Sequence, residues 1–262
     1  MDVQAYLDRI NYHGPLEPTA ETLRQLQVAH LLSVPFENLS IHAGEPIVLE
    51  DEALFRKIVS RRRGGFCYEL NGLFAALLRA LGFEVAMLSA QVASEIGEFS
   101  CDFDHMALLV TLEQRWLADV GFGDSFVAPL LLDRRDAQVQ GDRAYRIVAD
   151  GERLIVQRAD NSADNSIEWK SEYRFTLEPF QYADYEEMCQ YHQTSPLSHF
   201  TQGRICSRLT PRGRVTLSDR GDRGGWGDMN LITTELGERR ENPVATQEEY
   251  EEMLHQHFGI VL

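Results

Sequence analysis

A helix that begins directly after two glycines constrains the fold of this chain most. Residues 61–82 read RRRGGFCYELNGLFAALLRALG. The apolar residues of this stretch recur at helical spacing: Leu70, Phe74, Leu77 and Leu81. One face of a helix from about Cys67 onward is therefore built to enter a core. Cys67 then lies in the first turn, where backbone N–H groups lack partners and the helix dipole favours a thiolate. A cysteine considered alone is more often an inert core residue, so the rest of the chain decides between these interpretations.

The length and charge of the chain exclude several function classes. The chain has 262 residues, of which 44% are hydrophobic, and this is enough for one large domain or two to three small ones. A formal net charge of -16 would repel nucleic acid phosphates and anionic membranes. The one basic cluster is Arg61–Arg63, which is either an anion site or the solvated cationic end of the preceding helix. We expect no nucleic acid partner and no membrane partner.

The cysteines and the beginning of the chain indicate a cytoplasmic protein. The start MDVQAYLDRI lacks a cationic segment followed by an apolar one, and no run of about 18 apolar residues occurs. Four cysteines in a chain of this length predict thiols and no disulfide scaffold: Cys67, Cys101, Cys189 and Cys206. The pairs CQYH and CDFDH have no second matching pair, so we expect no metal.

The order of patterns along the chain is helical, then β, then mixed. Residues 17–39 place Leu23, Leu26 and His30 on one helical face after a threonine cap, and Pro35 ends the run. Residues 50–65 predict a second helix that ends at the glycine pair. Strands are predicted at 83–92, 105–112, 115–122, 143–150, 153–159, 214–220 and 229–236, with turns at 113–114 and 150–151. Residues 159–166 predict a mobile polar loop, and 246–260 a closing helix with a capping box between Thr246 and Glu249.

Cys67 could act as a nucleophile if a histidine and a carboxylate accompany it. Cysteine catalysis needs a thiolate, a general base and a group that fixes the tautomer of the base. His105 and Asp119 lie 14 residues apart on the predicted hairpin. A flat ladder leaves Asp119 a few residues out of step with His105, so strand twist or a bulge near Gly121 or Gly123 would have to close the gap. Alternatively, His105 is a strand-end histidine with satisfied hydrogen bonds and Asp119 is a turn former.

Several motifs in the same order resemble the arylamine N-acetyltransferase family. They are HLLSVPFENLSI, RRGGFCYELNGLF, DHMALLV followed by ADVGFG, and CQYHQTSPLSHFTQGRICSRLT, and the similarity runs from about Leu7 to the terminal HFGI. The resemblance implies an α+β fold with a cysteine-protease-like catalytic core. Its parts would be a helical bundle (1–82), a central antiparallel β-barrel (83–183) and a C-terminal α/β lid (184–262). It further implies that Cys67 is the nucleophile, His105 its base and Asp119 the orienting carboxylate.

The resemblance also implies where the two substrates bind. The acceptor pocket would contain Phe36, Phe122 and Phe200, although core packing is the ordinary role of a phenylalanine. The donor acetyl-CoA would lie near a loop that includes Gly121, Gly123 and Ser125. Asp124 departs from the family pattern, in which a glycine or neutral residue often follows GFG, and a carboxylate there is unfavourable beside phosphates.

The implied reaction is acetyl transfer from acetyl-CoA to the nitrogen of arylamines or arylhydrazines, through acetyl-cysteine and with ping-pong kinetics. The backbone N–H of Cys67 is the first candidate donor to the oxyanion. The helix start and His105 predict a lowered pKa for the Cys67 thiol. Three alternatives stay open: an amide synthase of the same fold that closes a macrocycle, a cysteine hydrolase or transglutaminase-like enzyme, and a non-catalytic binding module.

Overall fold

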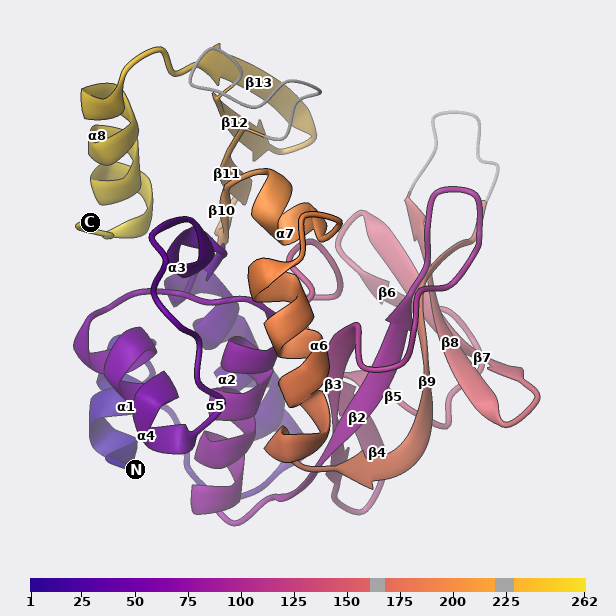
Figure 1. Ribbon diagram of the computed structural model, residues 1–262. Helices are drawn as coiled ribbons and strands as arrows, with labels where there is room; N and C mark the ends of the chain where they lie inside the picture. Colours follow the sequence, from indigo (N-terminus) through magenta and orange to yellow (C-terminus); the bar gives the residue numbers. More distant parts are fainter. Residues whose placement is uncertain (161–167, 220–228) are drawn as a thin grey trace.

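Helices of the first eighty residues form one side of the protein in the computed structural model, which describes residues 1–160, 168–219 and 229–262 (Figure 1). They are α1 (Val3–Arg9), α2 (Ala20–Ser33), α3 (Leu39–His42), α4 (Asp51–Phe55), the π-helical turn η1 (Arg56–Ser60) and α5 (Cys67–Ala80). The first twelve residues of α5 are all buried, because other elements cover every side of this helix. The helix start predicted at Cys67 is confirmed, and Thr19 caps α2 as expected, its hydroxyl accepting from the Thr22 N–H.

The prediction of a helix over residues 50–65 is wrong at its C-terminal end. Regular α4 passes into η1 and stops at Ser60. Arg62 has a positive φ of 53°, and Gly65 pairs with Phe36, whose successor Glu37 donates its N–H to the Gly65 carbonyl across 2.9 Å. Pairing with the segment around Phe36 therefore draws residues 61–65 out of the helix and leads the chain into Cys67.

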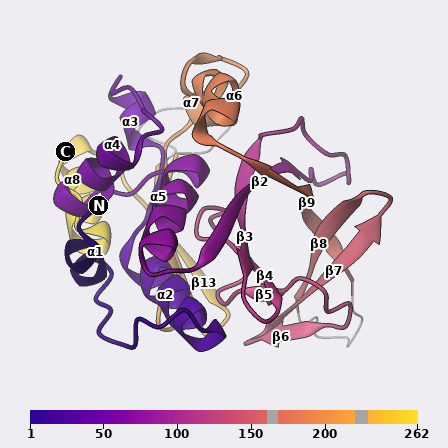
Figure 2. The same cartoon turned by 90° about the horizontal axis from the view of Figure 1, so that it is seen from below.

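Within the described residues, eight antiparallel strands curl into a barrel beside the helices, and Figure 2 shows them surrounding its interior. They are β2 (Glu84–Val92), β3 (His105–Thr111), β4 (Arg115–Ala118), β5 (Leu130–Leu131), β6 (Gln138–Gln140), β7 (Arg143–Asp150), β8 (Arg153–Asp160) and β9 (Lys170–Phe180). Their order is β5-β4-β3-β2-β9-β8-β7-β6. The turns predicted at 113–114 and 150–151 are confirmed by the β3–β4 and β7–β8 pairings. Most of the loop predicted at 159–166 lies outside the described residues.

Two glutamine side chains of β6 bind residues in and just before β5, and so join the two ends of the strand order. The Gln138 amide accepts from the Leu131 N–H (2.8 Å) and donates to the Leu131 carbonyl (3.1 Å). The Gln140 amide does the same at Ala128, and its oxygen also accepts from the Val127 N–H. These side chains supply the hydrogen bonds that a neighbouring strand would otherwise make.

A second sheet and a helix form the third part of the structure, at the top of Figure 1. The helices α6 (Tyr182–Thr194) and α7 (His199–Gln202) lead into β10 (Ile205–Thr210), β11 (Gly213–Ser218), β12 (Asn230–Glu235) and β13 (Glu238–Pro243), and α8 (Gln247–Phe258) follows. The Thr246 hydroxyl caps α8, as predicted, while Glu249 reaches back to the Ala245 N–H rather than to that of Thr246. The sequence missed the short strand β1 (Phe36–Glu37), which pairs with β10.

Three hydrophobic cores correspond to these parts. One joins α5 to β2, β3 and α6, one fills the barrel, and one lies between the second sheet and α8. The first core positions the candidate site, because it packs the start of α5 directly against β3. No helix in the described ranges is both long and apolar enough to cross a membrane.

Candidate active site

Cys67 is the first residue of α5 and faces a cavity. The residue before it, Phe66, is extended (φ −96°, ψ −172°), and its N–H donates to the Glu69 carboxylate across 3.1 Å, which fixes the helix start. Cys67 is 3% exposed. The cavity, of about 550 Å³, is lined by both Cys67 and His105. The structure therefore brings together the two residues that the sequence proposed as nucleophile and base.

His105 and Asp119 form a direct contact, with 2.7 Å between His105 Nε2 and Asp119 Oδ2. Strands β3 and β4 pair Leu108 with Ala118, and this register continues to place Asp119 two residues from the position opposite His105. Residues two apart share one face of a strand, so the carboxylate reaches the imidazole diagonally. No bulge near Gly121 or Gly123 is required.

Asn71 holds the Asp119 carboxylate in place, and the sequence analysis missed it. Its amide Nδ2 donates to Asp119 Oδ1 (2.9 Å) and to the Met106 carbonyl (2.6 Å), while its oxygen accepts from the Val120 N–H (2.9 Å). Asn71 is fully buried, one helical turn after Cys67. A buried amide on the nucleophile's own helix was the available signal, since such a group needs partners.

Further hydrogen bonds complete the surroundings of Asp119. The Gly121 N–H donates to Oδ1 across 2.8 Å, and the Asp119 N–H donates to Gln27 Oε1 across 3.2 Å. Asp119 is only 4% exposed. Asp119 Oδ1 is thus held by α5 and by the loop, and Oδ2 is left to accept from His105. The contact with Oδ2 fixes Nε2 as the protonated nitrogen of His105.

Gly121 is required by the close approach of its loop to α5. A Cβ atom at this position would lie 2.8 Å from Cys67 Cα and 2.7 Å from Asn71 Nδ2. Both distances are too short for any side chain. Gly121, two residues after Asp119, thus lets α5 pack directly on the chain that carries the Asp119 carboxylate.

The prediction of a lowered pKa for the Cys67 thiol is wrong, because the thiol is buried. Burial raises the pKa of the Cys67 thiol well above its ordinary value, and the negative charges of Asp104 and Asp119 act in the same direction. A hydrogen bond with the backbone of Met106, next to His105, lowers it only in part. An isolated Cys67 would therefore keep its proton at neutral pH, so thiolate formation depends on transfer of that proton to His105.

The three phenylalanines predicted for the acceptor pocket all line the cavity. The rings of Phe36 and Phe200 lie 6.2 Å apart, and Phe122 packs edge-on to His105 with 5.1 Å between ring centroids. Gly121 and Gly123 line it as well. Ser125 is instead buried below this surface, where its hydroxyl donates to the Glu172 carboxylate across 2.5 Å.

Asp124 is paired with two arginines. Its carboxylate accepts two bonds from Arg143 (2.7 and 3.0 Å) and one from Arg214 (3.1 Å), which belongs to β11 of the second sheet. Burial raises the pKa of Asp124, but these arginines outweigh it and hold the pKa below its usual value. The two arginines thus compensate the negative charge of Asp124, and its carboxylate connects the barrel to the second sheet across the cavity.

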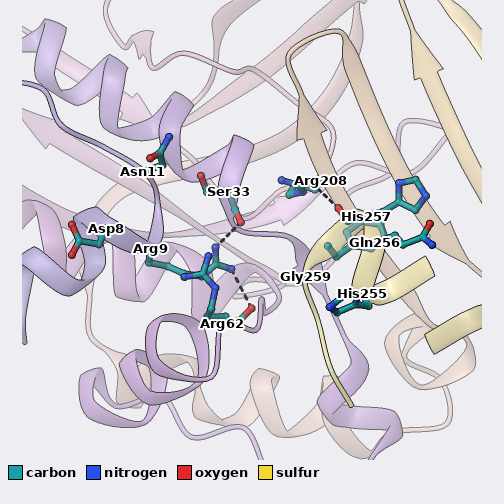
Figure 3. A pocket seen from close by; sticks show the side chains of 11 residues that line it. Asp8, Arg9, Asn11, Ser33, Arg62, Arg208, His255, Gln256, His257 and Gly259 are labelled. Atoms are coloured by element: carbon teal, nitrogen blue, oxygen red, sulfur yellow. Dashed lines mark hydrogen bonds between the residues drawn. The ribbon is translucent and has the colours of Figure 1, made fainter. Parts of the chain in front are cut away.

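A second cavity, of about 460 Å³, lies between α1, the end of α2 and α8 (Figure 3). Arg9 donates to the carbonyls of Ser33 (2.7 Å) and Ile58 (2.9 Å), and Arg208 to those of Leu32 (2.8 Å) and His257 (2.6 Å). Most of these carbonyls end helices, where a cation is stabilising. Arg9 and Arg208 therefore serve as helix caps.

The Arg61–Arg63 cluster is not a single site. Arg61 pairs with Glu45 across 3.0 Å, and Arg63 is buried against Glu37 across 3.0 Å. Arg62 is exposed and lines the second cavity. Within the described ranges, no group of three His, Cys, Asp or Glu side chains is arranged to hold a metal ion.

Comparison with known proteins identifies the class to which this fold and site belong. The model of an N-acetyltransferase family matches residues 19–262. The chain belongs to the arylamine N-acetyltransferase family, as its curated relatives show. It is 35% identical over 230 residues to arylamine N-acetyltransferase 1 of Bos taurus (81% of this chain, 79% of the relative). To the arylamine N-acetyltransferase of Mycolicibacterium smegmatis it is 37% identical over 228 residues (84% and 81%).

Solved structures agree with this assignment. The arylamine N-acetyltransferase of Mycobacterium marinum in complex with CoA superposes with a TM-score of 0.87 and 32% identity, covering 99% of this chain and 93% of that one. The predicted α+β fold with a helical part, an antiparallel barrel and a C-terminal part is therefore confirmed.

Proposed function

We propose that this chain transfers an acetyl group from acetyl-CoA to the nitrogen of aromatic amines or hydrazines. The observation that carries the proposal is the 2.7 Å contact between His105 Nε2 and Asp119 Oδ2, beside the cavity that Cys67 and His105 line. The aromatic walls of that cavity suit an aryl acceptor. The names of the relatives, and the complex of one of them with CoA, support the same substrates.

The first half-reaction acetylates Cys67. Asp119 occupies His105 Nε2, so Nδ1 is the nitrogen that takes the thiol proton. The sulfur attacks the thioester carbonyl, the carbon–sulfur bond to CoA breaks, and the departing CoA thiolate receives the proton from His105. One thioester replaces another, so the step is close to balanced. Asp119 stabilises the imidazolium while it exists.

The second half-reaction transfers the acetyl group to the acceptor. The amine attacks acetyl-Cys67, its proton passes to His105, and the Cys67 thiolate leaves and is then reprotonated. An arylamine is mostly neutral near pH 7, whereas an alkylamine with a pKa of about 10.4 is mostly protonated and does not attack. The acceptor class therefore follows from basicity as well as from the shape of the cavity.

The backbone N–H of Cys67 is the proposed donor to the oxyanion of each tetrahedral intermediate. At the start of α5 this group lies among N–H groups without an intrahelical partner. The positive end of the helix dipole adds to the stabilisation of the negative oxygen.

The division into domains 1–82, 83–183 and 184–262 and a cytoplasmic location belong to the same proposal. In that division the first domain contributes Cys67, the second His105 and Asp119, and the third Phe200. The cavity lined by Cys67, His105 and Phe200 supports a reaction site between domains.

The lifetime of acetyl-Cys67 tests the proposal against its alternatives. With acetyl-CoA alone we expect a burst of free CoA close to one per chain and one added acetyl group, mapped to Cys67 by mass spectrometry. Aniline or isoniazid should then discharge the label into an amide, and Cys67→Ala should show neither step. Steady release of acetate without amine would indicate a hydrolase. Absence of labelling would favour the amide synthase or the binding module.

A further inference from the structure

Two motifs that the catalytic triad does not use meet beside the reaction cavity. Asp104 of CDFDH directly precedes His105, and His192 of CQYH lies on α6. His192 Nε2 is 3.1 Å from Asp104 Oδ1, although the approach is not along the N–H bond, so the contact acts mainly through charge and dipole. The His192 side chain is 2% exposed and that of Asp104 is 15% exposed. A nearly buried histidine thus stands behind a carboxylate that keeps some open surface.

A chain of hydrogen bonds fixes the orientation of His192. The Phe200 N–H donates to Ser198 Oγ across 3.3 Å, and Ser198 Oγ lies 3.0 Å from His192 Nδ1. The Asp104 carboxylate, which only accepts, faces Nε2, so we assign the imidazole hydrogen to Nε2; Nδ1 then accepts from the Ser198 hydroxyl. The rings of His192 and Phe200 also pack edge to face, with 5.1 Å between centroids. His192 therefore presents a positive edge to Asp104.

The backbone at Asp104 is fixed as well. The Tyr68 hydroxyl contacts the Phe103 carbonyl (2.5 Å) and the Asp104 carbonyl (3.3 Å). Burial raises the pKa of Asp104, but the contacts of its carboxylate with His192 and Ser100 outweigh burial and hold the pKa below its usual value. Asp104 is consequently an ionised, immobile carboxylate at neutral pH.

Asp104 lines the same cavity as Cys67, His105 and Phe200. Its charge is close enough to Cys67 to raise the pKa of that thiol. The two arginines that line this cavity are each paired with a carboxylate other than Asp104, Arg214 with Asp124 and Arg239 with Glu241. An acceptor in the aromatic part of the cavity therefore meets a negative charge with room for additional hydrogen bonds, since a carboxylate has about four acceptor sites.

We propose that Asp104, positioned by His192, selects acceptors by charge. It favours aromatic amines or hydrazides that carry a second hydrogen-bond donor, and it disfavours those that carry a carboxylate. This inference rests on the proposed function, because it concerns the acceptor of the second half-reaction. Like charges repel most strongly where apolar walls exclude water, and a donor on the acceptor instead gains a charge-assisted hydrogen bond.

A competition between two acceptors of equal size tests the inference. 4-Aminobenzamide and 4-aminobenzoate are mixed at equal concentration with the enzyme and acetyl-CoA, and the two amide products are quantified. Both acceptors compete for the same acetyl-enzyme, so the ratio of the two amide products is independent of the first half-reaction. The wild-type ratio, corrected for the reactivity of each amine with a simple acetyl thioester in solution, should favour the benzamide. Asp104→Asn should shift it toward the benzoate by on the order of tenfold, the value of one charge-assisted contact.

Asp102→Asn is the matched control, since Asp102 pairs with Arg153 outside the cavity and should leave the ratio unchanged. A CoA burst verifies that each variant still forms the acyl-enzyme, and Asp104→Ser replaces the asparagine variant if that chain does not fold. His192→Gln should move the ratio in the same direction as Asp104→Asn. Two results would overturn the inference without affecting the proposed function. One is a wild-type product ratio equal to the ratio of the solution reactivities, and the other is an unchanged product ratio in an Asp104 variant that still gives the CoA burst. Loss of the burst in wild type would instead refute the function itself.

Discussion

Asn71 holds Asp119 by its amide nitrogen, 2.9 Å from Oδ1, while its amide oxygen accepts the N–H of the residue that follows Asp119. One side chain from α5 therefore fixes both the carboxylate and the backbone that carries it. Because Cys67 begins the same helix, Cys67 and Asp119 are tied to one rigid element. Displacement of α5 would move both together and preserve their separation.

The variant Asn71→Ala should therefore damage catalysis as well as stability. It leaves Asp119 Oδ1, the Met106 carbonyl and the Val120 N–H each short of one partner in a buried place. We expect the free energy of unfolding to fall by about 1–3 kcal/mol, measured by denaturant titration, and the CoA burst to slow. Gln193→Ala, which removes an amide that binds Ile47 away from the triad, should lower stability alone. A normal burst rate in Asn71→Ala would show that Asp119 needs no such support.

Asp119→Asn should keep the fold and lose most activity. An amide stabilises an imidazolium poorly and offers an N–H where His105 Nε2 needs an acceptor, so the wrong tautomer is favoured. We expect the burst rate to fall on the order of 10³-fold or more. Asp133→Asn removes a carboxylate that pairs with Arg115 on the surface and should behave as wild type. Near-normal turnover of Asp119→Asn would mean that another acid orients His105.

The alkylation of Cys67 should depend on His105. Burial raises the pKa of the isolated thiol, so deprotonation at neutral pH requires the imidazole as proton acceptor. We expect iodoacetamide to modify wild-type Cys67 at a lower pH than it modifies Cys67 of His105→Gln, in which the midpoint should lie above the ordinary thiol value of about 8.5. Peptide mapping is necessary because Cys101 is exposed. Identical pH profiles for the two proteins would show that Cys67 and His105 do not share a proton.

The three cavity phenylalanines should govern acceptor use more than donor use. Alanine at Phe36, Phe122 or Phe200 removes a flat apolar wall, and we expect the acceptor KM to rise roughly 5- to 20-fold while the CoA burst changes little. Phe55→Ala is a control, since this ring packs against the helical core outside the cavity. Equal damage to both half-reactions would count against an acceptor role.

Local patterns were sufficient for part of the site. The apolar spacing after the glycine pair predicted the helix start at Cys67, and the turn at 113–114 predicted the hairpin that carries His105 and Asp119. Both features depend on neighbours within a few residues, which a sequence displays directly.

Features that depend on distant partners were not predictable. Asn71 owes its role to Met106 and Asp119, and His192 meets Asp104, all contacts between separate elements. The strand at Phe36 is two residues long and exists because β10 and Gly65 lie on either side of it. The predicted direction of the Cys67 pKa shift was wrong for the same reason. The helix start is visible in the sequence, whereas the burial that outweighs its effect is not.

The amides of Gln138 and Gln140 close the barrel where backbone pairing stops, and this has a consequence for solubility. Strands β5 and β6 are the two ends of the strand order, so without these side chains each would present unpaired N–H and C=O groups to other molecules. A sheet edge of this kind recruits strands from neighbouring chains. Replacing both glutamines with alanine would leave Cys67, His105 and Asp119 in place, yet we expect it to promote edge-to-edge association between chains on storage.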